Sequence, residues 1–144
     1  EMGFYRAAAG AAAGTITWLQ DVTIDDSGNV LVKGVGCLGY GTGAGGTVTQ
    51  ATSRTTGVTL SKACGAITLV SAAGSTSWQS FTVTNTLVAA TDVVHVCQKS
   101  GTDLYEIHVT NVAAGSFKIS FKTTSGTTTE QPVFNFTVLK AVTS

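Results

Sequence analysis

The stretch that organises the chain is Leu38-Gly-Tyr-Gly-Thr-Gly-Ala-Gly-Gly-Thr-Val-Thr-Gln-Ala-Thr-Ser53, in which five glycines fall within eight residues. A helix is excluded here, because each glycine costs about 1 kcal/mol relative to alanine in a helix. A stable isolated strand is disfavoured as well, since glycines offer no side chains to pack. Glycines do allow two backbones to approach closely and give access to positive φ angles. We therefore predict a neck over residues 38–53, which joins an N-terminal stem, 1–37, to a compact domain, 54–144.

The composition argues against several classes of partner. Charged residues make up only 11% of the 144-residue chain, and the formal net charge is +0. Because the chain has no basic stripe, nucleic acid and acidic lipid are poor candidates as partners. No run of 18 apolar residues occurs, so we expect no membrane insertion. The chain begins with Glu-Met, from which we expect a fragment of a longer protein.

The three cysteines, Cys37, Cys64 and Cys97, are far apart and have no CxxC spacing. This is neither a disulfide framework nor a zinc-binding pattern. It predicts small buried thiols in a protein assembled in a reducing cytoplasm. The alternative, in which thiols meet at the symmetry axis of an oligomer, stays open.

The N-terminal segment has β-strand patterns but no obvious core. Asp25-Asp-Ser-Gly-Asn29 is a strong turn signal between two short apolar runs, so we predict a β-hairpin over residues 21–33. Residues 15–19 alternate and predict a further strand, with Ile16 and Trp18 on one face.

A lone hairpin is only marginally stable in water. We therefore predict an extended, intertwined stem whose apolar side chains are buried between identical copies of the chain. The candidates for this interface are Phe4, Trp18, Leu31 and Tyr40.

After the neck the pattern changes to short β-branched and aromatic runs separated by turn clusters. These runs are residues 57–60, 66–70, 80–84, 92–97, 104–110, 116–122 and 133–139. The last two runs alternate apolar and polar residues, which is typical of a sheet with one buried face. The sequence thus predicts an all-β protein with almost no helix, whose C-terminal domain is an antiparallel β-sandwich or jelly roll.

The neck and the Thr56-Gly-Val-Thr-Leu60 that follows it resemble a module at the C-terminal end of tail fibres and tailspikes of tailed bacteriophages. The resemblance continues through residues 81–85, 89–92, 113–117 and 132–140, and residues 22–30 resemble the repeating hairpins of fibre shafts. It implies a parallel homotrimer on the virion, with this module near the distal tip that meets the host surface. It also implies upstream fibre or baseplate proteins as partners.

Residues 41–46 formally match GxGxxG. A dinucleotide fingerprint must follow a strand and open a helix. Here Thr47-Val-Thr49 follows, which predicts a strand, so the nucleotide interpretation is disfavoured.

Two histidines and a carboxylate form a candidate metal site. If residues 99–102 are the turn of a hairpin, His95, Glu106 and His108 share one face, with His95 near Glu106 across the strands. Such a set can bind a metal such as zinc, but structural zinc sites require four close ligands. An exposed cross-strand polar cluster is the favoured alternative, and no cofactor is expected.

Catalytic constellations are hard to find in the sequence. Asp25 and Asp26 lie in a turn, where aspartate is favoured for local reasons, and the other carboxylates are scattered. No Gly-x-Ser-x-Gly elbow occurs. We expect a protein that is not an enzyme.

Binding is the better candidate function. Trp78 lies in a polar loop just before a predicted strand, where its ring can stack on a sugar while Gln79 and nearby serines hydrogen-bond to hydroxyls. The alternative is that Trp78 plugs the end of the sandwich or the trimer axis. Lys99 is a further candidate, as an exposed turn charge. Lys118 and Lys122 form a modest basic row on one strand face, for which solvation is a sufficient explanation.

Together with the resemblance, these residues predict a trimeric fibre tip that recognises a bacterial surface polysaccharide, capsule or lipopolysaccharide, through three linked weak sites. One alternative is a purely structural module that trimerises and caps a fibre or depolymerase spike. The other is an enzyme that degrades surface polysaccharide.

Overall fold

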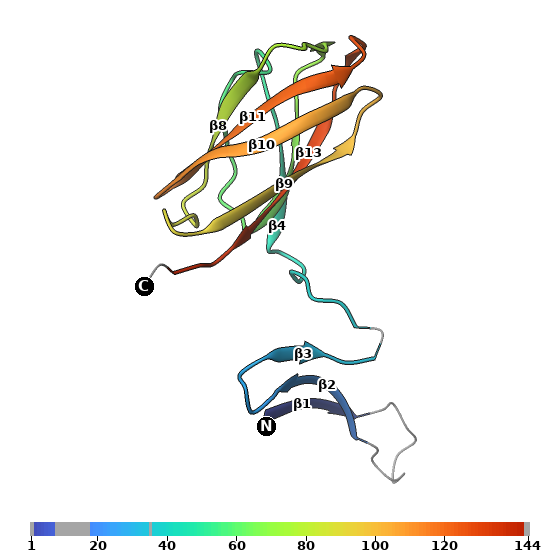
Figure 1. Ribbon diagram of the computed structural model, residues 1–144, viewed down its shortest axis with the longest axis vertical. Coiled ribbons are helices and arrows are strands. Elements are labelled where there is room, and N and C mark those ends of the chain that lie inside the picture. Colours follow the sequence, from blue (N-terminus) through green and yellow to red (C-terminus); the bar gives the residue numbers. More distant parts are fainter. Residues whose placement is uncertain (1, 8–17, 35, 143–144) are drawn as a thin grey trace. The chain divides into compact units, whose positions relative to one another are not determined.

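The computed structural model describes residues 2–7, 18–34 and 36–142, which form strands, turns and loops (Figure 1). No helix occurs in these ranges, and hence none that could cross a membrane. The chain divides into two compact units, Glu1–Gly39 and Tyr40–Ser144. The predicted all-β class is confirmed, and the division between the units falls inside the predicted neck.

The first unit contains a three-stranded antiparallel sheet in the order β1-β2-β3. Its strands are β1 (Met2–Ala7), β2 (Trp18–Ile24) and β3 (Val30–Val32). The pairing of β2 with β3 is the hairpin that the sequence predicts. Strand β1 was not predicted, because apolar and polar residues do not alternate along its sequence. The remainder of the predicted strand over 15–19, including Ile16, lies outside the described residues.

The turn between β2 and β3 is held by the Asp25 carboxylate. Its Oδ1 accepts hydrogen bonds from the backbone N–H groups of Ser27 and Asn29, each at 2.9 Å. Hydrogen bonds from Asn29, the side chain first and then the backbone, hold the pKa of Asp25 below its ordinary value of 3.8. Gly28 has a φ of 84°, a conformation in which glycine is the least strained residue.

One face of this small sheet is apolar along two rows of opposed residues. The rows are Met2, Ile24 and Val30, and next to them Phe4, Val22 and Val32. The pairing shifts at Asp21, which is an extra residue in β2, so Trp18, opposite Ala7, lies on the other face with Tyr5. Met2 is 58% exposed and Phe4 is 56% exposed, so the described residues of one chain leave much of this face uncovered.

Leu31, like Trp18, lies on the opposite face from Phe4. It lies opposite Thr23, in the row between the two apolar rows, and therefore on the other face of the sheet.

The second unit is built from two four-stranded sheets. One has the order β4-β6-β13-β9, with β4 (Gly45–Thr49), β6 (Cys64–Thr68), β13 (Val133–Leu139) and β9 (Val93–Ser100). Figure 1 shows β4, β9 and β13 in one layer, with β8, β10 and β11 in the other.

The other sheet has the order β10-β11-β8-β5. Its strands are β10 (Leu104–Ala113), β11 (Ser116–Ser125), β8 (Gln79–Thr84) and β5 (Val58–Thr59). All seven predicted runs after the neck therefore correspond to strands.

A separate short ladder pairs β7 (Ala72–Ala73) with β12 (Thr129–Glu130). The prediction of a purely antiparallel domain is wrong in two places, because β4 pairs with β6 and β5 pairs with β8 in parallel. Parallel neighbours need a crossover. The chain makes one by forming β5 in the opposite sheet before it returns as β6.

Alternating side chains from the two sheets form one core. Phe117, Ile119 and Phe121 on β11 are fully buried, as the sequence predicts. They meet the buried aromatic residues of β13, and the ring centroids lie 5.3 Å apart for Phe117 and Phe136 and 5.4 Å apart for Phe121 and Phe134. The second unit is therefore a sandwich whose core contains six buried aromatic side chains among aliphatic ones.

The glycine-rich stretch turns out to be part turn and part strand. Gly43 has a φ of 92°, the positive value expected in this stretch. Gly46 lies opposite Gly65 on β6, and a Cβ added to Gly65 would lie 2.8 Å from the Gly46 carbonyl oxygen. Close backbone approach is thus confirmed, but Gly45–Thr49 is a paired strand rather than part of a separate neck, because β6 supplies the partner that an isolated strand lacks.

The predicted hairpin with its turn at 99–102 is wrong, because β9 and β10 belong to different sheets. At this corner the Gln98 side chain replaces the backbone ladder. Its Nε2 donates to the Asp103 carbonyl at 2.8 Å, and its Oε1 accepts from the Tyr105 N–H at 3.0 Å.

A buried arginine ties several loops together at this end of the sandwich. Arg54 Nη1 donates to the Tyr105 hydroxyl at 2.9 Å, and Nη2 donates to the Glu130 carbonyl at 2.8 Å. The Tyr105 hydroxyl in turn donates to Glu130 Oε1 at 3.0 Å. Burial raises the pKa of Tyr105 to about 12, so this phenol is a neutral donor over the ordinary pH range.

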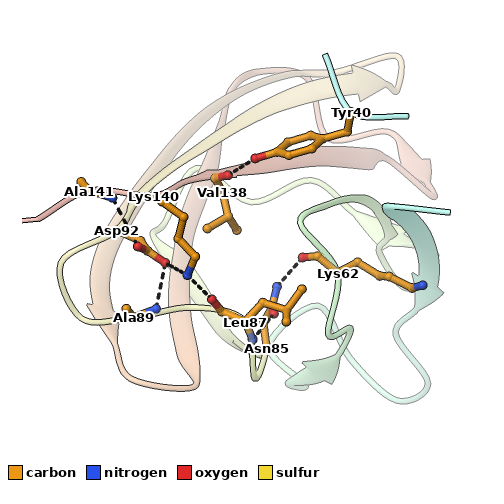
Figure 2. A network of polar contacts seen from close by, with 9 residues as sticks. All are labelled: Tyr40, Lys62, Asn85, Leu87, Ala89, Asp92, Val138, Lys140 and Ala141. Atoms are coloured by element: carbon orange, nitrogen blue, oxygen red, sulfur yellow. Dashed lines mark hydrogen bonds and ion pairs between the residues drawn. The ribbon is translucent and has the colours of Figure 1, made fainter. Parts of the chain in front are cut away.

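A second polar network fastens the segment after β13 (Figure 2). Asp92, which is buried, accepts from the Ala89 N–H at 2.8 Å and from Lys140 Nζ at 2.7 Å. Hydrogen bonds from Ala89 and then Lys140 hold the pKa of Asp92 below 3.8. Figure 2 also shows the Tyr40 hydroxyl donating to the Val138 carbonyl.

The cysteines are not the buried thiols that the sequence predicts. Cys37 and Cys97 are exposed, and Cys64 is partly buried.

Candidate functional site

Trp78 lies in the loop that leads into β8, and its side chain is 50% exposed. The loop is shaped locally, since Ser75 Oγ accepts from the Ser77 N–H at 3.2 Å. Thr123 N–H donates to the Ser75 carbonyl at 2.8 Å, which ties the loop to β11. Trp78 therefore does not plug the interior of the sandwich within one chain, and it offers an accessible aromatic surface.

Two cationic or polar side chains contact the Trp78 ring. Lys122 Nζ lies 4.8 Å from the ring centroid, in a cation–π contact. The His108 ring lies 5.5 Å away, tilted by 50°. These contacts restrict the orientation of the indole while half of its surface stays open to solvent.

Glu106 connects both neighbours of Trp78. Its Oε1 lies 3.0 Å from His108 Nε2, and its Oε2 lies 3.1 Å from Lys122 Nζ. The hydrogen bonds from His108 and then Lys122 hold the pKa of Glu106 below its ordinary value of 4.5. Exposed ion pairs contribute little to stability, so the value of this arrangement lies in positioning the side chains.

The register of three strands explains why these residues meet. Glu106 on β10 lies opposite Lys122 on β11, and Phe121 lies opposite Gln79 on β8. Lys122 therefore comes next to Trp78, which precedes Gln79. Because Phe121 points into the core, alternation sends Lys122 to the outer face. We call this outer face, with Trp78, Glu106, His108 and Lys122, the Trp78 face.

Hydroxyl groups extend the Trp78 face along β8 and β11. Ser80 lies opposite Ser120, and Thr82 lies opposite Lys118. The hydroxyls of Ser120 and Thr110 are 2.9 Å apart. An aromatic ring beside a row of hydroxyls and charged groups can bind a sugar chain, because pyranose rings present both apolar C–H faces and hydroxyl edges.

The other predicted binding residues are not gathered at Trp78. Gln79 lies opposite the buried Phe121 and alternates with Phe81, so it belongs to the inner face. Lys99 is exposed, but it lies on β9 in the other sheet.

The candidate metal ligands are also divided. His95 lies on β9 opposite Thr137, whereas Glu106 and His108 lie on β10 in the other sheet. The prediction that His95 lies near Glu106 across paired strands is wrong, because β9 and β10 do not pair with each other. Across the described ranges, no three His, Cys, Asp or Glu side chains are grouped so that they could hold a metal ion. The polar cluster that does form joins Glu106 to His108 and Lys122.

Sequence reasoning missed Lys122 as a neighbour of Trp78. The alternation of β11 places Lys122 on the solvated face, but only the pairing of β8 with β11 brings it to the loop. The sequence has no local signal for that pairing, because the two strands are separated by β9 and β10 along the chain.

Tyr40, a predicted interface residue, is half-exposed and is anchored within its own chain by the hydrogen bond to Val138.

Comparison with known proteins finds no family model, curated protein or solved structure that matches this chain.

Proposed function

We propose that the chain is the distal part of a tail fibre or tailspike of a tailed bacteriophage, and that it binds a bacterial surface polysaccharide non-covalently during host attachment. The observation that carries the binding proposal is the half-exposed Trp78 ring, held by Lys122 and His108 next to a row of hydroxyls. Aromatic side chains with polar neighbours are frequent anchors of recognition sites.

The fibre tip acts as a parallel homotrimer on the virion, joined to upstream fibre or baseplate proteins. Support comes from the first unit, in which two rows of apolar residues have no second layer among the described residues of one chain. Further copies of the chain would cover this face. Three linked Trp78 faces would then bind a repetitive glycan more tightly than one, because linkage raises the effective concentration of the second and third sites.

Cell binding tests the receptor proposal. The intact chain should bind host cells and not non-host cells, and Trp78→Ala should lose most of this binding. Trp78→Tyr should retain much of it, because it keeps a flat ring. Since Trp78 is half-exposed, both variants should unfold at nearly the wild-type temperature. Equal binding to host and non-host cells would remove the receptor claim.

A second candidate function is a structural module that only trimerises and caps a fibre or spike. The open apolar face of β1, β2 and β3 favours it, because that face explains assembly without a receptor. The two functions separate in one comparison: the structural module predicts trimers in which Trp78→Ala changes no measured attachment. New reducing or unsaturated ends on incubation with purified polysaccharide would instead favour a degrading enzyme.

A further inference from the structure

Although the formal net charge of the chain is zero, the charged residues are unevenly distributed between the two units. Residues 1–39 contain four Asp and Glu against two Lys and Arg, whereas residues 40–144 contain four Asp and Glu against six Lys and Arg. The sandwich is thus formally positive by two charges, and the first unit is negative by two.

Every carboxylate of the sandwich is engaged in contacts within the chain. Asp92 binds Lys140, and Glu106 binds Lys122 and His108. Asp103 accepts from the Thr128 N–H at 2.8 Å, and Glu130 accepts from the Asp103 N–H at 3.1 Å and from Tyr105. The Trp78 face therefore holds one carboxylate, and two neighbouring groups already occupy it.

Lys118 is the cation of the Trp78 face that has no carboxylate within ion-pair distance among the described residues. It is exposed on β11 and lies opposite Thr82 on β8 and Asn111 on β10. Alternation places it on the same face as Ser120 and Lys122. Four residues of strand separate Lys118 from Lys122, which is about 13 Å.

Trp78 and Lys118 thus mark the two ends of a strip, with the hydroxyls of Ser80 and Ser120 between them. A sugar chain that stacks on the indole and runs along the strands would bring one of its later residues to the free ammonium group. A carboxylate on that residue would form a charge-assisted hydrogen bond, which is stronger than a bond between neutral groups. A neutral sugar would leave the lysine without a counter-charge.

Resting on the binding function proposed above, we infer that the polysaccharide recognised by the Trp78 face is acidic, with uronate-type carboxylates that bind Lys118 while a neighbouring ring stacks on Trp78. The match is one of charge: the face has a free cation at one end and no free carboxylate to repel an anion. Nucleic acid is a poorer fit, since tight binding needs several phosphates to be neutralised and the face offers a single free lysine.

The test is binding of the intact protein to a panel of purified bacterial surface polysaccharides, neutral and uronate-containing. Each uronate polymer is also presented after chemical reduction of its carboxyl groups to alcohols. We expect binding to uronate polymers, a loss of about tenfold or more on carboxyl reduction, and weaker binding as salt rises. Lys118→Gln should lose about as much, and Lys118→Arg should retain most of the affinity.

Lys62→Gln is the matched control, since it removes the same charge from the segment between β5 and β6, outside the Trp78 face. Its binding should equal that of the wild type. Equal affinity for native and carboxyl-reduced polymers, with binding still lost in Trp78→Ala, would overturn the acidic specificity and leave the proposed function intact. No binding to any polysaccharide would overturn both proposals. Tighter binding to single-stranded DNA than to any uronate polymer would also overturn the inference.

Discussion

The sheet of β1, β2 and β3 and the sandwich of residues 40–142 follow the same alternation rule with different outcomes. In the sandwich, the apolar face of each sheet meets the other sheet, and Phe117, Phe121 and Phe134 are fully buried. In the first unit, two complete apolar rows have no second layer within the described part of the chain, and Phe4 stays mostly exposed.

The difference teaches that alternation specifies a buried face without specifying what buries it. The sandwich contains its own second layer, whereas the small sheet needs a partner from outside the described chain. Three short strands are close to the lower limit of independent stability in water. The proposed trimer places that partner in identical copies, so association should depend on the first unit and folding stability on the sandwich.

The largest effect is expected from removing the first unit. Deletion of residues 1–33 should abolish or strongly weaken the trimer, and sedimentation should report a single chain. The sandwich should keep nearly its full thermal stability, because its core lies within residues 40–142. A truncated protein that remains an equally stable trimer would show that association depends on the sandwich.

Two phenylalanine truncations sharpen the comparison. Phe134→Ala removes a fully buried ring between the two sheets and should lower the free energy of unfolding by about 3–5 kcal/mol, measured with denaturant. Phe4→Ala should leave the unfolding of the sandwich unchanged and instead reduce the fraction of trimer in sedimentation. If Phe4→Ala changed neither property, the apolar rows would not be an interface.

A smaller effect is expected from alkaline pH in the sandwich. The pKa of Tyr105 is raised to about 12 in the folded state, while an unfolded tyrosine ionises near 10. The stabilisation of the folded state by the neutral Tyr105 phenol is therefore complete below pH 10 and is lost as the pH rises from 10 to about 12. The expected loss is about 2–3 kcal/mol of unfolding free energy.

The control for this effect is a pair of variants. Tyr105→Phe should be destabilised at neutral pH, because Arg54 loses a buried acceptor, and should show a flatter alkaline profile. Tyr40→Phe, at a half-exposed position, should retain the alkaline loss. If the unfolding free energy of Tyr105→Phe fell at alkaline pH as much as that of the wild type, another group would be responsible for the loss.

Alternation made much of the sandwich predictable from sequence. The seven runs after the neck are strands, and the inward residues of β11 and β13 are those that the pattern indicates. Strand β1 was not predicted because Met2-Gly-Phe-Tyr-Arg-Ala7 lacks the alternation of apolar and polar residues that identifies strands.

Connections between strands were less predictable than the strands themselves. Residues 99–102 have the length and composition of a hairpin turn, but the Gln98 side chain forms bonds that a backbone ladder would otherwise make. Because β9 and β10 therefore do not pair with each other, His95 and Glu106 do not lie opposite each other. The neighbours of Trp78 were hidden for a related reason, since they depend on β8 pairing with β11 across an intervening segment.

The position of β13 has a consequence for the way the sandwich is made. This strand lies between β6 and β9 and supplies Phe134, Phe136 and Val138 to the core. During synthesis, β6 and β9 leave the ribosome well before β13 and cannot join until residues 133–139 have emerged. One edge of β6 and one edge of β9 therefore stay unpaired until those seven residues are available, and the sheet is completed when β13 inserts between them.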